Sequence, residues 1–264
     1  LSSSSAASDV YKRQLLRSHP NVQFDDAQLS SKTPGEIGPA NISINGAQFY
    51  QNAFLVDGIN MNNDIDPAEY RVQLLDAVPG RSQGLALDTD LLENITVLDS
   101  NVPAAYGGFN GGVIDAQTRA PTQALHGKFS VQTTRSAWTQ YHVDESEEQR
   151  MENSGSPDEQ PKFDKVTVRG TLQGHLTDNF GLLGSFSQKR STIPLGFYSY
   201  NNVEEMGFHE EKQQRRIDNY FLKSVWKASD QLTVETSVTH APEESHYFLS
   251  LIHISEPTRL LSIS

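Results

Sequence analysis

The chain has 264 residues and a formal net charge of −12, which argues against a nucleic-acid-binding protein because such proteins carry a basic footprint. It contains no cysteine, which excludes disulfide frameworks, thiolate zinc sites and cysteine nucleophiles. Its residues are 36% hydrophobic, and no stretch approaches the roughly 18 consecutive apolar residues of a membrane-spanning helix.

The two ends of the chain have the character of non-native sequence. Residues 1–14 include SSAASDVYKRQ and residues 249–264 include LSLIHISEPTRL, and each string resembles the translation of a sequencing adapter. A match at both ends is hard to ascribe to chance, so these segments are set aside before the fold is considered. We expect residues 15–248 to be the natural sequence; the competing interpretation is a Ser-rich tail and a short apolar C-terminus.

Helix and strand signals are mixed in the first half, residues 15–121. Residues 15–22 predict a short helix that ends at His19-Pro20, because the residue before a proline disfavours helical geometry. Short strands are predicted at residues 42–44, 54–56, 91–98 and 113–114. The first two end at Asn45-Gly46 and Asp57-Gly58, pairs that tolerate positive φ and form tight turns. This mixture indicates a small α+β domain.

The second half, residues 122–248, shows the two-residue alternation of β-strands. Residues 165–176 are the clearest case, because Val166, Val168 and Leu172 share one face and the polar residues between them share the other. Further strands are predicted at about 127–142, 180–190, 216–227 and from 232 onwards.

Long and short connections alternate between these strands. The tight turns are at 177–179 and 228–231, and the long polar loops are at 144–161 and 192–214. Such wiring is typical of a transmembrane β-barrel. A soluble antiparallel sheet can show the same alternation, so the strand pattern leaves both open. The acidic first loop is predicted to be a mobile surface segment, with ordered ion binding as the alternative.

Motifs in the first half follow one another in a characteristic order. They are residues 42–46 (ISING), 54–58 (FLVDG), 91–98 (LLENITVL), Tyr106-Gly107, Gly111-Gly112-Val113-Ile114 and Thr118-Arg119. In this order and spacing they resemble the plug domain of TonB-dependent outer-membrane receptors, where the segments read I-x-I-R-G, L-V-D-G, E-R-I-E-V-L and Y-G…G-G-V-I-x-x-x-T-[KR]. The departures from the family pattern indicate a divergent branch, and they are Asn21, Asn45, Thr96 and the Asp99-Ser100 pair.

The resemblance implies an α+β plug domain over residues 15–121, followed over residues 122–248 by antiparallel β-strands of a truncated transmembrane β-barrel. In the intact receptor the plug would fill a barrel of roughly 22 strands. The implied location is the outer membrane of a Gram-negative bacterium, in contact with its lipid. The implied function is energised uptake of a saccharide, a peptide or a metal chelate by a monomer that is not an enzyme and has no cofactor.

The resemblance also implies a partner, the energy-transducing protein TonB. It binds an N-terminal box by strand addition, in which backbone hydrogen bonds supply much of the affinity. We expect that box upstream of residue 15, outside this chain.

Two sets of residues are candidates for functional surfaces of the plug. By family topology the loops after Gly46 and Gly58 lie near the cargo, and their candidate contacts are Gln48, Phe49, Tyr50, Gln51, Asn60, Asn62, Asn63 and Asp64. Aromatic and amide side chains suit sugar or peptide recognition, although packing against the barrel accounts equally well for the two aromatic residues. The residues of the structural motif are Asn45, Gly46, Asp57, Gly58, Tyr106, Gly107, Gly111 and Gly112.

The charge of the predicted plug bears on the cargo. Residues 15–121 hold 5 basic and 13 acidic side chains, a net charge of −8. So acidic a plug would not attract an anionic ferric chelate, which favours neutral or cationic cargo such as saccharides or peptides.

Catalytic and metal-binding patterns were weighed against this interpretation. The chain contains no H-E-x-x-H and no G-x-S-x-G motif. Residues 60–69 resemble a calcium loop but carry Ile65 where an EF-hand needs glycine, and Arg71 stands where it needs glutamate. A solvated polar loop is therefore expected, and no metal ligand is assigned.

Two rival functions remain open at this point. One is a soluble periplasmic or secreted β-rich carbohydrate-binding or hydrolase domain, which requires the order of the plug motifs to be accidental. The other is a receptor that signals or adheres without transport.

Overall fold

The computed structural model describes residues 19–25, 30–65, 67–68, 81–140, 144–152, 154, 156, 158–195 and 211–246. Both adapter-like ends lie outside the described residues, as do most of the helix expected before His19-Pro20 and residues 196–210 of the second long loop. Across the described residues, no helix has the length and apolar character needed to cross a membrane.

The N-terminal unit contains two small sheets. Strands β1 (Val22–Phe24) and β2 (Ile42–Ile44) pair antiparallel. The second sheet has the order β4-β3-β6-β5, built from β3 (Ala53–Val56), β4 (Ile59–Asn60), β5 (Leu92–Leu98) and β6 (Val113–Thr118). Strand β3 runs parallel to β6, and the other pairs are antiparallel. Two 3-10 turns, η1 (Phe49–Gln51) and η2 (Thr89–Leu91), precede β3 and β5. In its described residues, the expected α+β unit is built mainly of strands.

One hydrophobic core joins these two sheets. Its buried members are Val22, Ile42, Ile44, Phe54 and Ile114, drawn from β1, β2, β3 and β6. Each such side chain stabilises the fold by about 1.5–3 kcal/mol relative to full exposure. The short apolar runs of the sequence are therefore the strands that build the core.

The two predicted turns have the backbone conformation that the sequence implied. The φ angles are 55° and 73° at Asn45-Gly46, and 49° and 77° at Asp57-Gly58. Asp57-Gly58 closes a tight hairpin in which Val56 pairs with Ile59. Asn45-Gly46 instead leads from β2 into η1, because β2 pairs with β1.

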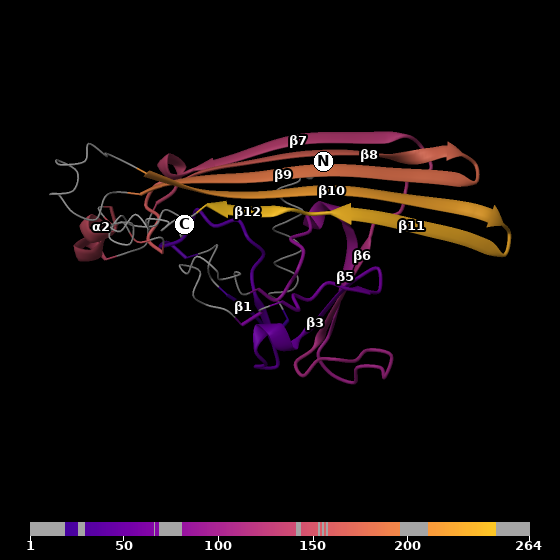
Figure 1. The fold of residues 1–264 in the computed structure, drawn as a ribbon, viewed down its shortest axis with the longest axis horizontal. Helices are drawn as coiled ribbons and strands as arrows, with labels where there is room; N and C mark the ends of the chain where they lie inside the picture. The colour runs from indigo at the N-terminus through magenta and orange to yellow at the C-terminus, as the bar shows by residue number, and fades with distance from the viewer. Residues whose placement is uncertain are drawn as a thin grey trace, which may run out of the picture.

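The C-terminal half forms one long antiparallel sheet of the order β11-β10-β9-β8-β7 (Figure 1). Its strands are β7 (His126–Arg135), β8 (Asp164–Thr177), β9 (Phe180–Leu195), β10 (Glu211–Ser229) and β11 (Leu232–His240). A short strand, β12 (Glu243–His246), continues past β11 and also pairs with β10. The predicted strands are present, and β9 and β10 extend several residues beyond the predicted limits. The strand predicted at about 127–142 is shorter, because β7 ends at Arg135. The strands form an open sheet, as expected for part of a barrel.

The two faces of this sheet differ in the way that the alternation predicted. On the outer face Leu172, Leu176 and Trp226 are more than half exposed. On the inner face Arg169 and Lys223 are buried, at 5% and 6% exposure. Figure 1 shows the N-terminal unit lying against one side of the sheet. The N-terminal unit therefore covers the inner face, where charged side chains such as Arg169 and Lys223 are buried beside apolar ones such as Leu183.

The first long loop contains regular structure that the sequence did not predict. A 3-10 turn, η3 (Ser136–Trp138), follows β7 within the stretch predicted as strand, and a helix, α2 (Glu145–Glu152), lies in the loop itself. Three glutamates in the first turn of α2 suit the positive end of the helix dipole. Met151 and Gln160 are buried, so the loop folds back onto the protein.

Candidate functional site

A buried ion pair connects the N-terminal unit to the sheet. The carboxylate of Asp88 lies 2.9 Å from Nε of Arg169 and 3.8 Å from Nζ of Lys189. Its backbone N–H donates to the side-chain oxygen of Asn219 at 3.2 Å. Burial alone would raise the pKa of Asp88, but the charges of Lys189 and Arg169 and two hydrogen bonds outweigh it and lower that pKa to about 2. Asp88 is therefore ionised at physiological pH.

Further ion pairs join the two halves at other levels of the sheet. Nζ of Lys223 on β10 lies 3.8 Å from the carboxylate of Asp57 and 3.1 Å from Oγ1 of Thr118. Asp57 also accepts the Thr118 N–H at 2.8 Å, so the tight turn is tied to both β6 and the sheet. Three more carboxylate–cation pairs cross the same boundary, and they are Glu36–Arg215, Asp90–Lys128 and Glu243–Arg81.

These contacts account for part of the negative net charge of the plug. Four of its carboxylates, those of Glu36, Asp57, Asp88 and Asp90, pair with cations of the sheet. The net charge of the unit thus reflects how it is held, and is a poor guide to cargo charge. The sequence-based preference for neutral or cationic cargo, which rests on a net charge of −8, stays a prediction.

The segment before β2 is fixed to the long-loop end of the sheet. The Gly35 N–H donates to the side chain of Gln160 at 3.0 Å, and the Gly35 carbonyl accepts from Ser191 at 2.6 Å. The Gln160 N–H donates to the Lys32 carbonyl at 2.6 Å. The long loop and the N-terminal unit therefore form a continuous hydrogen-bonded surface.

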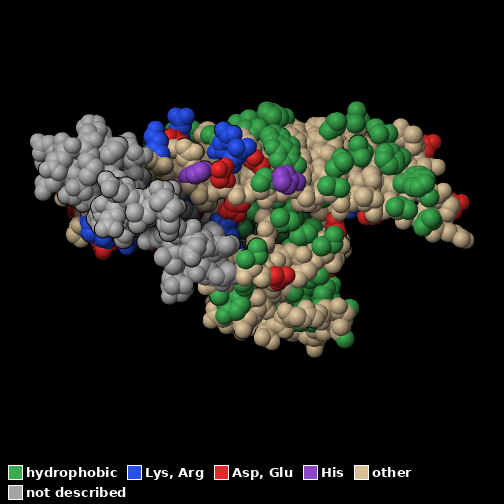
Figure 2. Space-filling view, in the orientation of Figure 1, with side chains coloured by type: hydrophobic (Ala, Val, Ile, Leu, Met, Phe, Trp, Pro, Cys, Tyr) green, Lys and Arg blue, Asp and Glu red, His purple; other side chains and the backbone are tan. Residues whose placement is uncertain are grey.

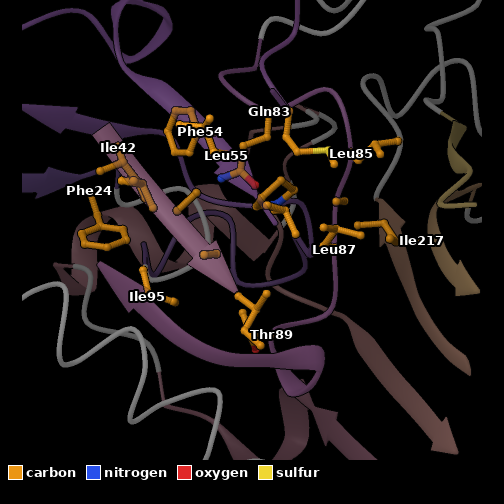
Figure 3. Close-up of a pocket in the computed structure, with 18 of the residues that line it drawn as sticks. Phe24, Ile42, Phe54, Leu55, Gln83, Leu85, Leu87, Thr89, Ile95 and Ile217 are labelled. Carbon is orange, nitrogen blue, oxygen red and sulfur yellow. The ribbon is translucent and has the colours of Figure 1, made fainter. Parts of the chain in front are cut away.

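Apolar contacts complete this boundary but fill it incompletely. Leu91 of the N-terminal unit packs with Leu183 and Phe221 of the sheet. Nearby, the described residues line a cavity of about 140 Å³ that Figure 3 shows between the core around Phe54 and Ile217 of β10. The unit is held mainly by ion pairs and hydrogen bonds, with limited apolar packing.

A second hollow is polar and belongs wholly to the N-terminal unit. It measures about 380 Å³ and brings together five of the eight predicted contact residues with the turn at 105–108. Those five are Tyr50, Asn60, Asn62, Asn63 and Asp64. Tyr106 lines the opposite side and donates a hydrogen bond to Asp115 at 2.8 Å. The fold thus brings these five predicted residues close to Tyr106, which is 40 positions or more away from each of them in the chain.

Not every amide in this hollow is available to a ligand. Asn62 donates to the Asn52 carbonyl at 2.7 Å and accepts the Phe54 N–H at 2.9 Å, so it holds β3 in place. The oxygens of Asn60 and Asn63 cap local turns, which leaves their NH₂ groups without a partner among the described residues. The groups open to a ligand are therefore donors, together with Asp64.

Three predicted contacts do not line the hollow. They are Gln48, Phe49 and Gln51. The Gln51 side chain accepts the Gln48 N–H at 3.0 Å, and the ring of Phe49 meets that of Tyr50 edge-on at 5.4 Å. These residues shape the η1 turn. The groups that sequence reasoning missed are Asp88, Arg169 and Lys223, because no local motif marks contacts between positions 81 or more residues apart.

No group of three or more His, Asp or Glu side chains in the described ranges is placed to hold a metal ion. The calcium-like segment is described only in part, since Asp66 and Glu69 are outside the described residues.

Comparison with known proteins accounts for this arrangement, in which a small unit lies against one face of an amphipathic sheet. Residues 3–114 match the family described as TonB-dependent Receptor Plug Domain. A curated relative, the uncharacterized protein YddB of Escherichia coli strain K12, is 37% identical over 237 residues, which is 88% of this chain. The chain therefore carries a TonB-dependent receptor plug domain.

Solved structures agree with the plug and barrel strands. The outer-membrane transporter YddB from Escherichia coli matches 89% of this chain and 31% of its own, with 36% identity and a TM-score of 0.78. The siderophore receptor PirA from Acinetobacter baumannii covers 91% of the chain with 19% identity and a TM-score of 0.51, which shows the fold alone. The chain spans about 30% of the length of its curated relative. Its location is the outer membrane of a Gram-negative bacterium.

Three of the departures from the TonB-dependent receptor pattern lie together in the plug. Asn21 donates to the Asp99 carboxylate at 2.6 Å, and Asn45 donates to the Asp99 carbonyl at 2.7 Å. The hydrogen bond from Asn21 is the main reason why the pKa of Asp99 is lowered. Asn21, Asn45 and Asp99 are thus joined to one another by hydrogen bonds.

Proposed function

We propose that the whole receptor carries out TonB-dependent uptake of a nutrient across the outer membrane, with the polar hollow of the plug as part of its cargo site. The observation that carries this proposal is the attachment of the plug. Ion pairs between charged groups, such as Asp57 and Lys223, hold the plug to the barrel wall. Contacts of this kind can be exchanged for water when TonB pulls on the plug, whereas a continuous apolar core could not be.

The chemistry of the hollow favours a neutral or cationic cargo. Tyr50 offers a half-exposed aromatic ring, and Asn60 and Asn63 offer NH₂ donors. Asp64 is the charged residue among the described lining, which contains no lysine or arginine. A hydroxyl-rich saccharide or a peptide can stack on the ring and accept these hydrogen bonds. An anionic metal chelate would meet the carboxylate.

Uptake is tested with the full-length receptor that carries these residues, produced in Escherichia coli with and without TonB. The probes are ¹⁴C-maltohexaose, ¹⁴C-trilysine and a ⁵⁵Fe–catecholate chelate. We expect the neutral or the cationic probe to accumulate only when TonB is present. Accumulation without TonB would refute energised uptake, and accumulation of the iron chelate alone would refute the cargo chemistry. If no probe accumulates, the signalling receptor becomes the better interpretation.

Single substitutions test whether the hollow contacts the cargo. Tyr50→Ala and Asn63→Ala should each weaken uptake about tenfold, equivalent to roughly 1.4 kcal/mol, mainly through a higher half-saturation concentration. Gln48→Ala is the matched control, because Gln48 is close in sequence but does not line the hollow. Equal uptake by all three variants would remove the hollow from the cargo site while leaving uptake itself standing.

A further inference from the structure

Three glycines lie on the outer, lipid-facing side of the barrel strands without an evident need for glycine. They are Gly127, Gly170 and Gly184, and none has a positive φ among the values recorded for the described glycines. A Cβ added at these positions would meet its nearest neighbour at 3.6, 3.8 and 3.9 Å, which is ordinary contact. Glycine inside a strand costs about 0.5–1 kcal/mol relative to alanine. We infer that these three glycines, which have no side chain, leave space on the outer surface of the sheet.

The strand register shows the shape of that space. Gly170 is paired with Phe129 on one side and Phe186 on the other. In the next row, Gly184 is paired with Leu172 and Leu222. Glycine and large apolar side chains therefore alternate across the four strands β7 to β10 and leave an open apolar trough on the outer face. A trough of this kind accepts an approaching hydrocarbon group.

Two arginines lie beyond one end of the trough. Arg190 is four residues from Phe186 on β9, so its side chain is on the same face about 13 Å further along the strand. Its direct cross-strand partner is Arg216. Asp218 binds Arg216 at 2.6 Å, but no carboxylate within 4.0 Å of Arg190 occurs among the described residues. Arg216 also faces Glu244 across the strand pair on its other side, so Asp218 and Glu244 offset its charge. Arg190 is therefore the guanidinium of the pair that is less compensated, and it favours an anion beside it.

Figure 2 shows basic, acidic and histidine side chains gathered beside apolar patches on this sheet. The arginines lie toward the end of the sheet that carries the long connections, which is the outward-facing end in outer-membrane barrels. An anion at this level would therefore belong to the outer leaflet. The apolar trough extends from it toward the middle of the membrane.

We propose that the trough and Arg190 form a binding site for one phosphorylated, acylated glycolipid of the outer leaflet, of the lipid A type. One acyl chain lies over Gly170 and Gly184, between Phe186 and Leu222. A phosphate binds the guanidinium group of Arg190, whose N–H donors match its oxygens. The site is distinct from the cargo hollow, and it ties the barrel strands to a defined lipid.

The test uses the full-length receptor, purified in detergent, and measures binding of bisphosphorylated lipid A by native mass spectrometry. Arg190→Gln should weaken binding about tenfold. Gly170→Leu, which fills the trough, should weaken it by at least as much. The matched controls are Arg135→Gln, an outward arginine already paired with Asp164 at 3.3 Å, and Val131→Leu, which adds volume beside the trough. Both controls should bind as the unmodified receptor does.

Comparison of lipids separates the possible occupants. Dephosphorylated lipid A should bind the unmodified receptor as weakly as bisphosphorylated lipid A binds the Arg190→Gln variant. Phosphatidylglycerol binding with the same affinity and the same loss on substitution would make the occupant an ordinary phospholipid and overturn the assignment. Equal binding of lipid A by all variants would overturn it as well, as would a receptor dimer that the Gly170→Leu variant alone fails to form. Uptake should be unchanged in Arg190→Gln, so failure here is separable from failure of the proposed transport.

Discussion

Asp88 illustrates how much one side chain contributes to the attachment of the plug. Its carboxylate accepts the Asp90 N–H at 3.0 Å, which caps η2, and it also pairs with Arg169 and Lys189. Arg169 is 5% exposed, so it depends on this partner for its charge to be tolerated. The same residue therefore starts a local turn and holds two halves of the molecule together.

Substitution Asp88→Asn removes the charge but keeps an oxygen that can cap η2. We expect it to destabilise the docked plug by about 3–5 kcal/mol, because it removes the buried carboxylate charge that pairs with both Arg169 and Lys189. Hydrogen exchange of β5 and β6 in the full-length receptor measures this. The control is Lys128→Gln, which breaks a pair whose lysine is half exposed and should cost less than about 1 kcal/mol. Equal exchange in both variants would contradict the importance of the buried pair.

Because the pKa of Asp88 is lowered, the effect of Asp88→Asn on hydrogen exchange should depend on pH. Because the pKa is about 2 in the folded receptor and near 3.8 otherwise, the contribution of this carboxylate is complete above about pH 4. It is lost as the pH falls from about 4 to 2. We therefore expect the difference in hydrogen exchange between the unmodified receptor and Asp88→Asn to be constant from pH 7 to 5 and to vanish toward pH 2. A difference that persists at pH 2 would show that charge is not its cause.

At the level of elements, the sequence predicted those features that local chemistry decides. The turns at Asn45-Gly46 and Asp57-Gly58, and the alternating faces of β8, follow from φ preferences and a two-residue period. The parallel pairing of β3 with β6 could not be predicted in this way, because it joins residues 60 positions apart. The helix α2 was missed because its acidic, polar composition resembles that of a solvated loop.

The candidate site was predictable to the same extent. Five lining residues were found because they follow recognisable turns, and they are Tyr50, Asn60, Asn62, Asn63 and Asp64. The sequence did not show that Asn62 is a structural amide. Asn62 binds the carbonyl of Asn52, and only the folded chain shows that Asn52 lies between β2 and β6. Local patterns therefore located the loops, and long-range packing decided which side chains remain free.

The glycine pair at the start of β6 allows an element-scale test. A Cβ at Gly112 would lie 2.7 Å from the Ile44 side chain and 2.9 Å from the Leu98 carbonyl oxygen. Gly112→Ala should therefore force β2 and β5 apart and destabilise the plug by about 1–3 kcal/mol. At Gly107 a Cβ would meet nothing within 4 Å, so Gly107→Ala is the matched control. Hydrogen exchange of β2 and β6 in the full-length receptor distinguishes them, and equal protection would refute the close approach.

The stability of the whole molecule depends on covering the apolar outer face and the open edges of the sheet, which the described residues do not cover. The outer face of the sheet exposes large apolar side chains, including Phe129 at 72% and Leu172 at 58%. Strands β7 and β11 are both edges, with backbone groups open to further pairing. The plug covers the inner face, but lipid and further strands are needed for the rest.

These surfaces determine how the 264-residue chain should behave when it is produced by itself. In buffer without detergent we expect it to aggregate through its apolar face and open edges, and to lack a sharp unfolding transition. Size-exclusion chromatography and urea denaturation followed by tryptophan fluorescence, which reports on Trp138 and Trp226, measure both properties. A detergent above its micelle concentration should reduce the aggregation by covering the outer face, yet leave the edge strands unpaired. A monomer that unfolds cooperatively in plain buffer would show that the sheet does not face lipid, because a stable soluble domain rarely leaves so large an apolar surface open to water.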